Sequence, residues 1–126
     1  MRRKYGNSRV EMDGHVFDSR KEAKYYLYLR DLEKRGLICD LKLQVPFELL
    51  PAIYEEETVH LKTKDKVVRK CVQKAVHYLA DFVYTGAQSK AMVVVDVKSA
   101  ATRKDKAYVL KKKMMRALLG ITITEA

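Results

Sequence analysis

The sequence predicts a mixed α/β domain in which helices pack on a small sheet. Strand-like runs rich in valine and aromatic residues lie at positions 75–84 and 91–98, and helical spacing lies at positions 19–36 and 103–119. The resulting order of helix, several strands, helix and strand is typical of a sheet covered by helices. With 126 residues, of which 48% are hydrophobic, we expect a single domain with its own core over residues 1–126.

The first part of the chain predicts an arm, a hairpin and a helix. Residues 1–8 are expected to form a flexible basic arm, and no apolar stretch follows their positive charges, so they do not predict a secretory signal. An Asp-Gly pair inside residues 9–17 favours a tight turn between two short strands. Asp18 or Ser19 caps the next helix, which is expected to end at about Gly36.

The middle of the chain predicts strands separated by polar turns. Residues 42–54 contain two prolines, which suit an edge or bulged strand. Residues 55–65 are polar and predict an exposed loop or hairpin tip. Residues 67–84 predict one long extended segment, and a turn at 85–90 connects it to the valine-rich strand.

The last part of the chain predicts a small-residue connection at 99–102, a helix at 103–119 and a short strand at 121–124. Glycine at position 120 is expected to stop the helix. One helical stripe of apolar side chains is expected to face the sheet, and its members are Ala107, Leu110, Met114 and Leu118.

The formal net charge of +10, from 26 basic and 16 acidic residues, favours a polyanionic partner. The excess is concentrated between Lys98 and Arg116, where eight basic residues accompany one acid. No segment approaches the roughly 18 consecutive apolar residues of a membrane span. Cys39 and Cys71 lack metal-type spacing, and two reduced thiols are typical of a cytosolic protein.

A candidate site follows the valine run at positions 93–95. Side chains alternate along a strand, so Asp96 and Lys98 are expected on one face while Val97 points into the other layer. Asp81 lies on the preceding strand at hairpin distance, where its carboxylate can meet that of Asp96. Two carboxylates and a lysine suit a divalent-cation site for cutting phosphodiesters. The alternatives are a surface ion pair between Asp96 and Lys98 and a strand-end acid at Asp81.

Glu22 is a third acid with two readings. It lies in the first turn of the first helix and continues the apolar stripe that should face the sheet, where a carboxylate is costly unless it is paired or metal-bound. Residues 19–22 also match a capping box, in which Glu22 only accepts a hydrogen bond from the backbone. The two roles do not exclude each other.

The segment 78–82 (Tyr-Leu-Ala-Asp-Phe), followed by Val-Asp-Val-Lys at 95–98, resembles the motif of the PD-(D/E)XK nuclease superfamily. The helix-first order and the basic helix after the lysine agree with the restriction-endonuclease-like αβββαβ core of that superfamily. Residues 17–23 and 43–47 resemble small phage-encoded members related to Holliday junction resolvases. The resemblance extends from about residue 10 to residue 123.

This resemblance implies a metal-dependent endonuclease that uses Mg²⁺ or Mn²⁺. By it, Asp81 and Asp96 are metal ligands, Glu22 is the helix acid near the metal, Lys98 is the catalytic lysine and Gln44 is an additional site residue. The motif's proline is replaced by alanine at position 80, a common departure in the superfamily.

The basic helix and the N-terminal arm are expected to hold the DNA backbone. The expected DNA-binding residues are Arg103, Lys104, Lys106, Tyr108, Lys111 and Lys112. For Tyr108 the alternative is a packing role at the edge of the core.

The resemblance further implies branched DNA as the substrate, a homodimer that cuts two strands symmetrically, and the host cytoplasm as location if the chain is phage-encoded. Two other functions stay open from the sequence. One is a non-catalytic nucleic-acid-binding protein, and the other is a phage nuclease without branch specificity.

Overall fold

The structure is a computed structural model of the chain, and it describes residues 9–126. The arm expected over residues 1–8 lies outside the described residues. A four-stranded sheet has the order β3-β6-β7-β8, in which β7 and β8 are parallel and the other neighbours antiparallel. Its strands are β3 (Ile38–Leu50), β6 (Val76–Gly86), β7 (Met92–Asp96) and β8 (Thr124–Glu125), and its helices are α1 (Arg20–Lys34) and α2 (Lys106–Leu119). The predicted mixed α/β fold is confirmed.

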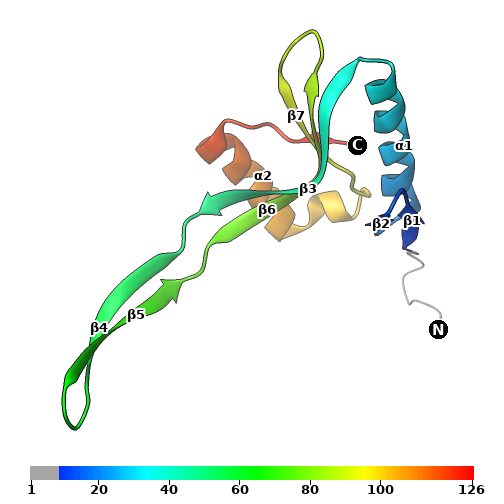
Figure 1. Ribbon diagram of the computed structural model, residues 1–126. Helices are drawn as coiled ribbons and strands as arrows, with labels where there is room; N and C mark the ends of the chain where they lie inside the picture. Colours follow the sequence, from blue (N-terminus) through cyan, green and yellow to red (C-terminus); the bar gives the residue numbers. More distant parts are fainter. Residues whose placement is uncertain (1–8) are drawn as a thin grey trace.

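The two helices cover opposite faces of this sheet (Figure 1). On the α1 side, Phe17, Leu29 and Phe82 belong to one buried cluster. On the α2 side, Tyr78 and Met115 belong to a second buried cluster. Apolar burial on both faces explains why the central strands β6 and β7 read as nearly continuous hydrophobic runs.

The N-terminal hairpin and the first helix form where the sequence predicts them. Strands β1 (Val10–Met12) and β2 (His15–Phe17) pair around Asp13 and Gly14, whose φ angles are 52° and 79°. Positive φ at both central residues is the requirement of a type I′ turn. Ser19 then caps α1, and its side-chain oxygen accepts a hydrogen bond from the Glu22 amide. A glycine with φ of 76° follows the helix end at position 36.

Strand β3 is an edge strand, as its prolines predict, because it pairs only with β6. Pro46 lies within β3, where an edge position tolerates the missing amide hydrogen. Pro51 lies between β3 and the next strand, so it separates two elements instead of interrupting one.

The polar segment 55–65 was expected as an exposed loop or hairpin tip; it is the outer part of a hairpin, so the hairpin alternative is confirmed and the loop alternative is wrong. Strands β4 (Ile53–His60) and β5 (Asp65–Gln73) form a two-stranded ribbon that projects far from the sheet (Figure 1). Only the short connection 61–64 is a turn. Opposite charges favour the pairing of this glutamate-rich strand, since Glu55 and Glu56 lie across from Lys70 and Arg69, although neither pair is close enough to form an ion pair.

The long extended segment expected over residues 67–84 is two strands. Residues 74 and 75 separate β5 from β6, and only β6 belongs to the main sheet. The last strand is also shorter and later than predicted, since β8 comprises Thr124–Glu125. Ile123 just before it is buried in the α2-side cluster.

Helix α2 differs from the prediction at its start and in its buried face. A 3₁₀ helix, η1 (Thr102–Lys104), precedes it, and Asp105 caps it by accepting a hydrogen bond from the Tyr108 amide. Tyr108 and Met115 are buried, whereas Leu110 and Leu118 of the predicted stripe are more than half exposed. The helix carries apolar residues on several sides, so helical spacing alone does not identify the buried face. The face that packs on the sheet is rotated from the predicted stripe.

In the described part of the chain, neither helix combines the length and the apolar character needed to cross a membrane.

Candidate functional site

Asp81 and Asp96 lie at the end of the β6–β7 ladder. The ladder pairs Phe82 with Val95, so the next residues in register are Asp81 and Asp96. Backbone pairing has therefore brought the two predicted acids opposite each other. Val97 beyond them packs against the α1-side cluster, and Lys98 returns to the face of Asp96. The predicted alternation of these residues is confirmed.

Asp96 is buried, with 2% of its surface exposed. Its Oδ2 accepts a hydrogen bond from the Tyr78 hydroxyl. Its Oδ1 is buried and has no hydrogen-bond partner among residues 9–126, and the Lys98 ammonium lies 3.6 Å from it. An ionised oxygen without a donor is costly to bury, so this arrangement favours a cation close to Oδ1.

Asp81 is held by backbone and side-chain donors. Its Oδ2 accepts a hydrogen bond of 2.9 Å from the Val97 amide, and its Oδ1 accepts one of 3.4 Å from the Gln44 side chain. Burial raises the pKa of Asp81 to about 7, and the adjacent carboxyls of Asp96 and Glu22 act in the same direction. The ionised form is therefore disfavoured unless a positive charge compensates it.

The amide and the carboxylate of Glu22 have different partners. Its amide donates to the capping oxygen of Ser19, while its carboxylate accepts a 3.2 Å hydrogen bond from Gln44. Only 6% of Glu22 is exposed, and burial, followed by the charge of Asp18, raises its pKa. Gln44 consequently bridges Glu22 to Asp81, which brings together the three predicted acids and the predicted amide.

Both strands are distorted at this point. Ala80 is buried on the α2 side and Phe82 on the α1 side, although residues two apart on a regular strand share a face. Strand β6 thus changes face at Asp81. On β3, Gln44 has a positive φ of 52° beside the same position. Such conformations are costly for residues other than glycine, and they cluster at functional sites.

A cavity of about 340 Å³ adjoins Asp81, whereas Asp96 and Gln44 do not belong to its lining. Glu22, Asp81 and Lys98 line it together with polar side chains, which include Asp18, Ser19, Lys21, Ser99 and Thr102. The Lys21 ammonium donates to the Lys98 carbonyl, so it fixes the backbone that carries the site lysine. Lys98 also lies 5.2 Å from the centre of the Tyr108 ring.

The predicted DNA-binding residues fall into two groups. Arg103, Lys104, Lys106 and Lys111 are exposed or half-buried around the start of α2. Tyr108 is buried, which matches its packing alternative, and its hydroxyl donates to Glu125. Lys112 donates to the same carboxylate over 2.6 Å. Neither Tyr108 nor Lys112 is therefore a free surface group.

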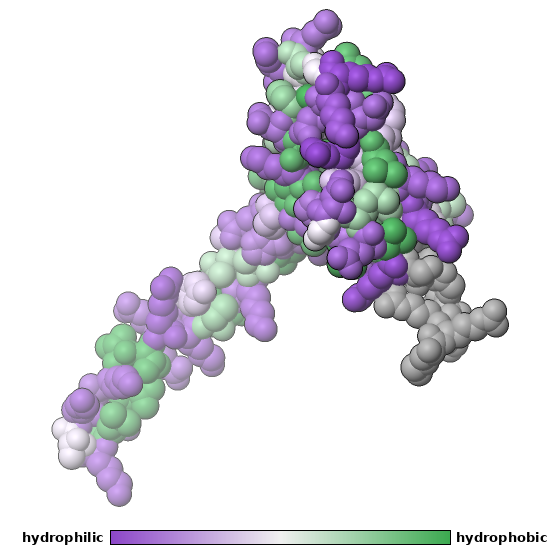
Figure 2. Space-filling view, turned by 45° about the vertical axis from the view of Figure 1, so that its right-hand side comes forward, coloured by the Kyte–Doolittle hydropathy of each residue, from purple (hydrophilic) through white to green (hydrophobic). Residues whose placement is uncertain are grey.

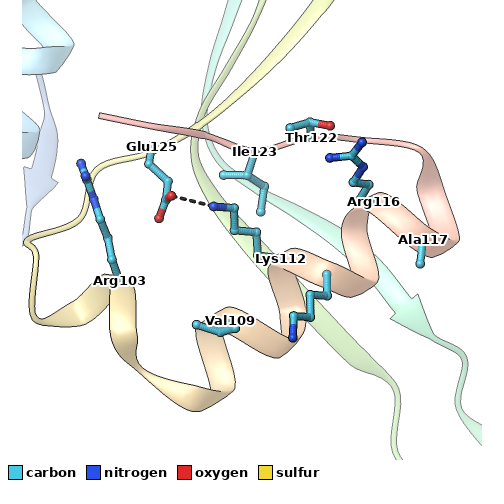
Figure 3. A pocket seen from close by; sticks show the side chains of 9 residues that line it. Arg103, Val109, Lys112, Arg116, Ala117, Thr122, Ile123 and Glu125 are labelled. Atoms are coloured by element: carbon cyan, nitrogen blue, oxygen red, sulfur yellow. Dashed lines mark hydrogen bonds and ion pairs between the residues drawn. The ribbon is translucent and has the colours of Figure 1, made fainter.

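A second hollow, of about 710 Å³, lies between α2 and the C-terminal strand. Its apolar residues include Val109, Ala117 and Ile123, and Figure 3 shows cationic side chains around them. These cations are Arg103, Lys112, Lys113 and Arg116. Glu125 is the one acid of this lining, and the ammonium of Lys112 lowers its pKa.

Sequence reasoning missed two residues of this region. Strict alternation places Tyr78 on the opposite face of the strand from Asp81, so its contact with the site was not predicted. Glu125 lies across from Asp96 in the parallel β7–β8 ladder and collects the bonds of Tyr108 and Lys112. A tyrosine three residues before the first acid was the available signal for Tyr78, whereas Glu125 had none before the register of β8 was known.

No three His, Cys, Asp or Glu side chains within residues 9–126 converge in an arrangement that would hold a metal ion. Any proposed cation site in this region must therefore be built on the carboxylates of Asp81 and Asp96.

Comparison with known proteins identifies a family without an assigned activity. No curated protein and no solved structure matches the chain. Residues 2–120 match the family described as a protein of unknown function, DUF1064, and the chain therefore belongs to this family.

Proposed function

We propose that the chain is a metal-dependent endodeoxyribonuclease of the PD-(D/E)XK superfamily. The observation that carries the proposal is the pair of carboxylates at Asp81 and Asp96, opposite each other at the end of a buried ladder, with Lys98 beside them. The order α1-β3-β6-β7-α2-β8, with the β4–β5 ribbon inserted, supports a restriction-endonuclease-like core.

The donor set fits a hard divalent cation. Asp96 Oδ1 has no hydrogen-bond donor among residues 9–126 and only the Lys98 ammonium at 3.6 Å, and burial raises the pKa of Asp81, so a further cation would stabilise both ionised carboxylates. Mg²⁺ is commonly held by one or two carboxylates while waters and substrate phosphate complete its shell, so two acids suffice. In this proposal Asp81 and Asp96 hold Mg²⁺ or Mn²⁺, and Glu22 assists directly or through water. The bound cation would polarise the phosphoryl group and lower the pKa of a water.

The remaining side chains orient these groups. Lys98, about a third of whose side chain is exposed, positions the attacking water and offsets charge that develops on the phosphate. Gln44 holds the carboxylates of Glu22 and Asp81 through its amide group. Tyr78 donates a hydrogen bond to Asp96 Oδ2 and so fixes the orientation of the carboxylate, whose Oδ1 takes no part in this bond. Tyr78 and Gln44 thus act as positioning residues.

The basic residues supply the binding surface for a polyanion. The exposed cations at the start of α2 adjoin the site cavity, because Thr102 belongs both to the cavity lining and to η1. Lys113 and Arg116 extend positive charge along the second hollow. Neutralising DNA phosphates at these positions would release counterions and make binding dependent on salt. The proposed substrate class is branched DNA and the proposed assembly a homodimer, on the resemblance described above.

A cleavage assay tests the proposal. Wild type and Asp96→Asn are incubated with four-way junction, flap, linear duplex and single-stranded DNA in Mg²⁺, Mn²⁺ or EDTA. We expect metal-dependent cleavage by wild type that Asp96→Asn abolishes. Asp31→Asn is the matched control, since Arg35 is the one ion-pair partner of this exposed acid on α1 within residues 9–126.

Two outcomes would contradict the assigned activity. Cleavage that survives Asp96→Asn unchanged would remove the site from the reaction. Binding of DNA by wild type without cleavage in either metal would instead favour a non-catalytic nucleic-acid-binding protein. Cleavage of all four substrates at similar rates would leave the nuclease and reject the preference for branched DNA.

A further inference from the structure

Almost every residue of the β4–β5 ribbon is exposed to solvent, on a pair of strands that no other sheet or helix within residues 9–126 supports. Its two strands make their principal contacts with each other, and it projects away from the body of the molecule (Figures 1 and 2). Every residue of β4 is exposed, and Val68 is the one residue of β5 that is half-buried. A lone two-stranded ribbon is marginally stable in water, so a partner that covers it would explain its length.

The ribbon also displays apolar side chains at unusual density. Six of the sixteen large apolar side chains exposed in the described residues lie on these 21 positions. They are Ile53, Tyr54, Val59, Leu61, Val67 and Val72. Figure 2 shows hydrophobic surface along the ribbon between charged groups. These side chains are spread over both faces, since Val59 and Val67 lie on opposite sides of the ladder, so they mark the ribbon as a whole as an interaction surface and do not select one face.

The register of the ribbon separates its two faces. Residues directly across a ladder share a face, so one face carries Glu55, Glu57 and Val59 from β4 with Lys66, Val68 and Lys70 from β5. We refer to these six residues as the open face. On the opposite face, the Arg69 guanidinium covers the Tyr54 ring at 4.0 Å, and His60 pairs with Asp65 at 2.7 Å.

The charged side chains of the open face lack ion-pair partners within residues 9–126. In the part of the chain that the structure describes, its two glutamates and two lysines form no ion pair, although Glu55 lies directly across from Lys70. The acids all lie on β4 and the bases all lie on β5. The open face is therefore complementary to a copy of itself that is turned by a two-fold axis along the ribbon.

We propose that the open face of the β4–β5 ribbon is a homodimer interface. Two ribbons stack face to face, so that each β4 lies against the partner's β5 and each Glu55 lies against the partner's Lys70. The two valines of each open face are then buried between the ribbons. This contact is isologous and closed, as the interfaces of most soluble homodimers are.

Other arrangements fit the charges less well. Pairing β4 with β4 edge to edge would place acids against acids, and pairing β5 with β5 would place bases against bases. A duplex along the open face would meet Glu55 and Glu57, which repel phosphates, on the side of the ribbon formed by β4. The open face contributes six residues per ribbon, fewer than the roughly 20–30 per partner of a standard interface, so the contact through the ribbons is a small one.

Charge reversal on the full chain tests the interface. Variant A carries Glu55→Lys and Glu57→Lys, and variant B carries Lys66→Glu and Lys70→Glu. Light scattering coupled to size exclusion should give twice 14.6 kDa for wild type and 14.6 kDa for each variant alone. An equimolar mixture of A and B should regain the dimer mass, because the reversed faces are complementary to each other.

The matched control is Glu56→Lys with Asp65→Lys, which makes the same charge change as variant A on the opposite face. It should remain a dimer. Far-UV circular dichroism verifies that each variant folds. If a variant does not fold, hydrogen exchange on wild type replaces it, and amides of residues 53–73 should gain protection as protein concentration rises.

The proposal is overturned by a monomeric wild type, by exchange that does not depend on concentration, by dimers that survive both reversals, or by a mixture that stays monomeric. A monomeric wild type whose DNA affinity falls in variant B would assign the ribbon to nucleic acid. The inference does not rest on hydrolysis, since a dimer that cleaves nothing would leave it intact.

Discussion

Replacing Asp81 with asparagine should stabilise the metal-free protein at neutral and alkaline pH. Asp81 is half-buried beside two other carboxyls, and burial raises its pKa from 3.8 to about 7. Asparagine keeps an oxygen for the Val97 amide but carries no charge. The substitution therefore removes the cost of ionising a carboxyl in this position while it retains the main hydrogen bond.

The sign follows from proton linkage. A folded-state pKa above the unfolded value means that the native state holds the proton more tightly, so stability is full below about pH 4 and is lost as the pH rises through about 7. The shift corresponds to about 4 kcal/mol at most. Because Asp81 is partly open to the cavity, screening by solvent reduces this to on the order of 2 kcal/mol.

Urea unfolding followed by circular dichroism in EDTA measures the effect. Between about pH 5 and about pH 8 the unfolding free energy of wild type should fall relative to that of Asp81→Asn by about 2 kcal/mol. Groups that titrate equally in both proteins cancel in this difference. If the unfolding free energies of the two proteins change with pH in parallel, the pKa of Asp81 is not raised in the folded state and the reasoning is refuted.

Two further substitutions test the packing around the site. Met115→Ala should lower the unfolding free energy by about 2–5 kcal/mol, because Met115 is fully buried, whereas Leu118→Ala should cost under about 1 kcal/mol; equal effects in urea unfolding would reject the assigned face of α2. Tyr78→Phe should cost about 1.5–3 kcal/mol, since it leaves the second oxygen of Asp96 without a donor. A thermal melt of Tyr78→Phe that matches wild type would show that this hydrogen bond contributes nothing.

Signals that depend on neighbouring residues were readable in the sequence. The Asp-Gly turn, the Ser19 cap and the helix-ending glycines each act over a few residues, and all lie where predicted. The register that joins Asp81 to Asp96 was also accessible, because a short turn connects two strands and fixes their pairing.

Features that depend on distant partners were not readable. Glutamates disfavour a strand in isolation, so residues 55–65 predicted only an exposed loop or hairpin tip, and the long pairing of β4 with the basic strand β5 was not anticipated. Several sides of α2 are apolar, and the sheet alone selects the side with Met115. The bond of Tyr78 to Asp96 depends on the face change of β6 at Asp81, which no alternation rule anticipates.

The most direct test of the proposed cation site is a crystal structure of the protein soaked in Mn²⁺, with anomalous diffraction recorded at the manganese edge. The account predicts an anomalous peak between the carboxylates of Asp81 and Asp96, within coordinating distance of Asp96 Oδ1. A fully occupied crystal form with these carboxylates accessible and no peak between them at saturating Mn²⁺ would contradict it.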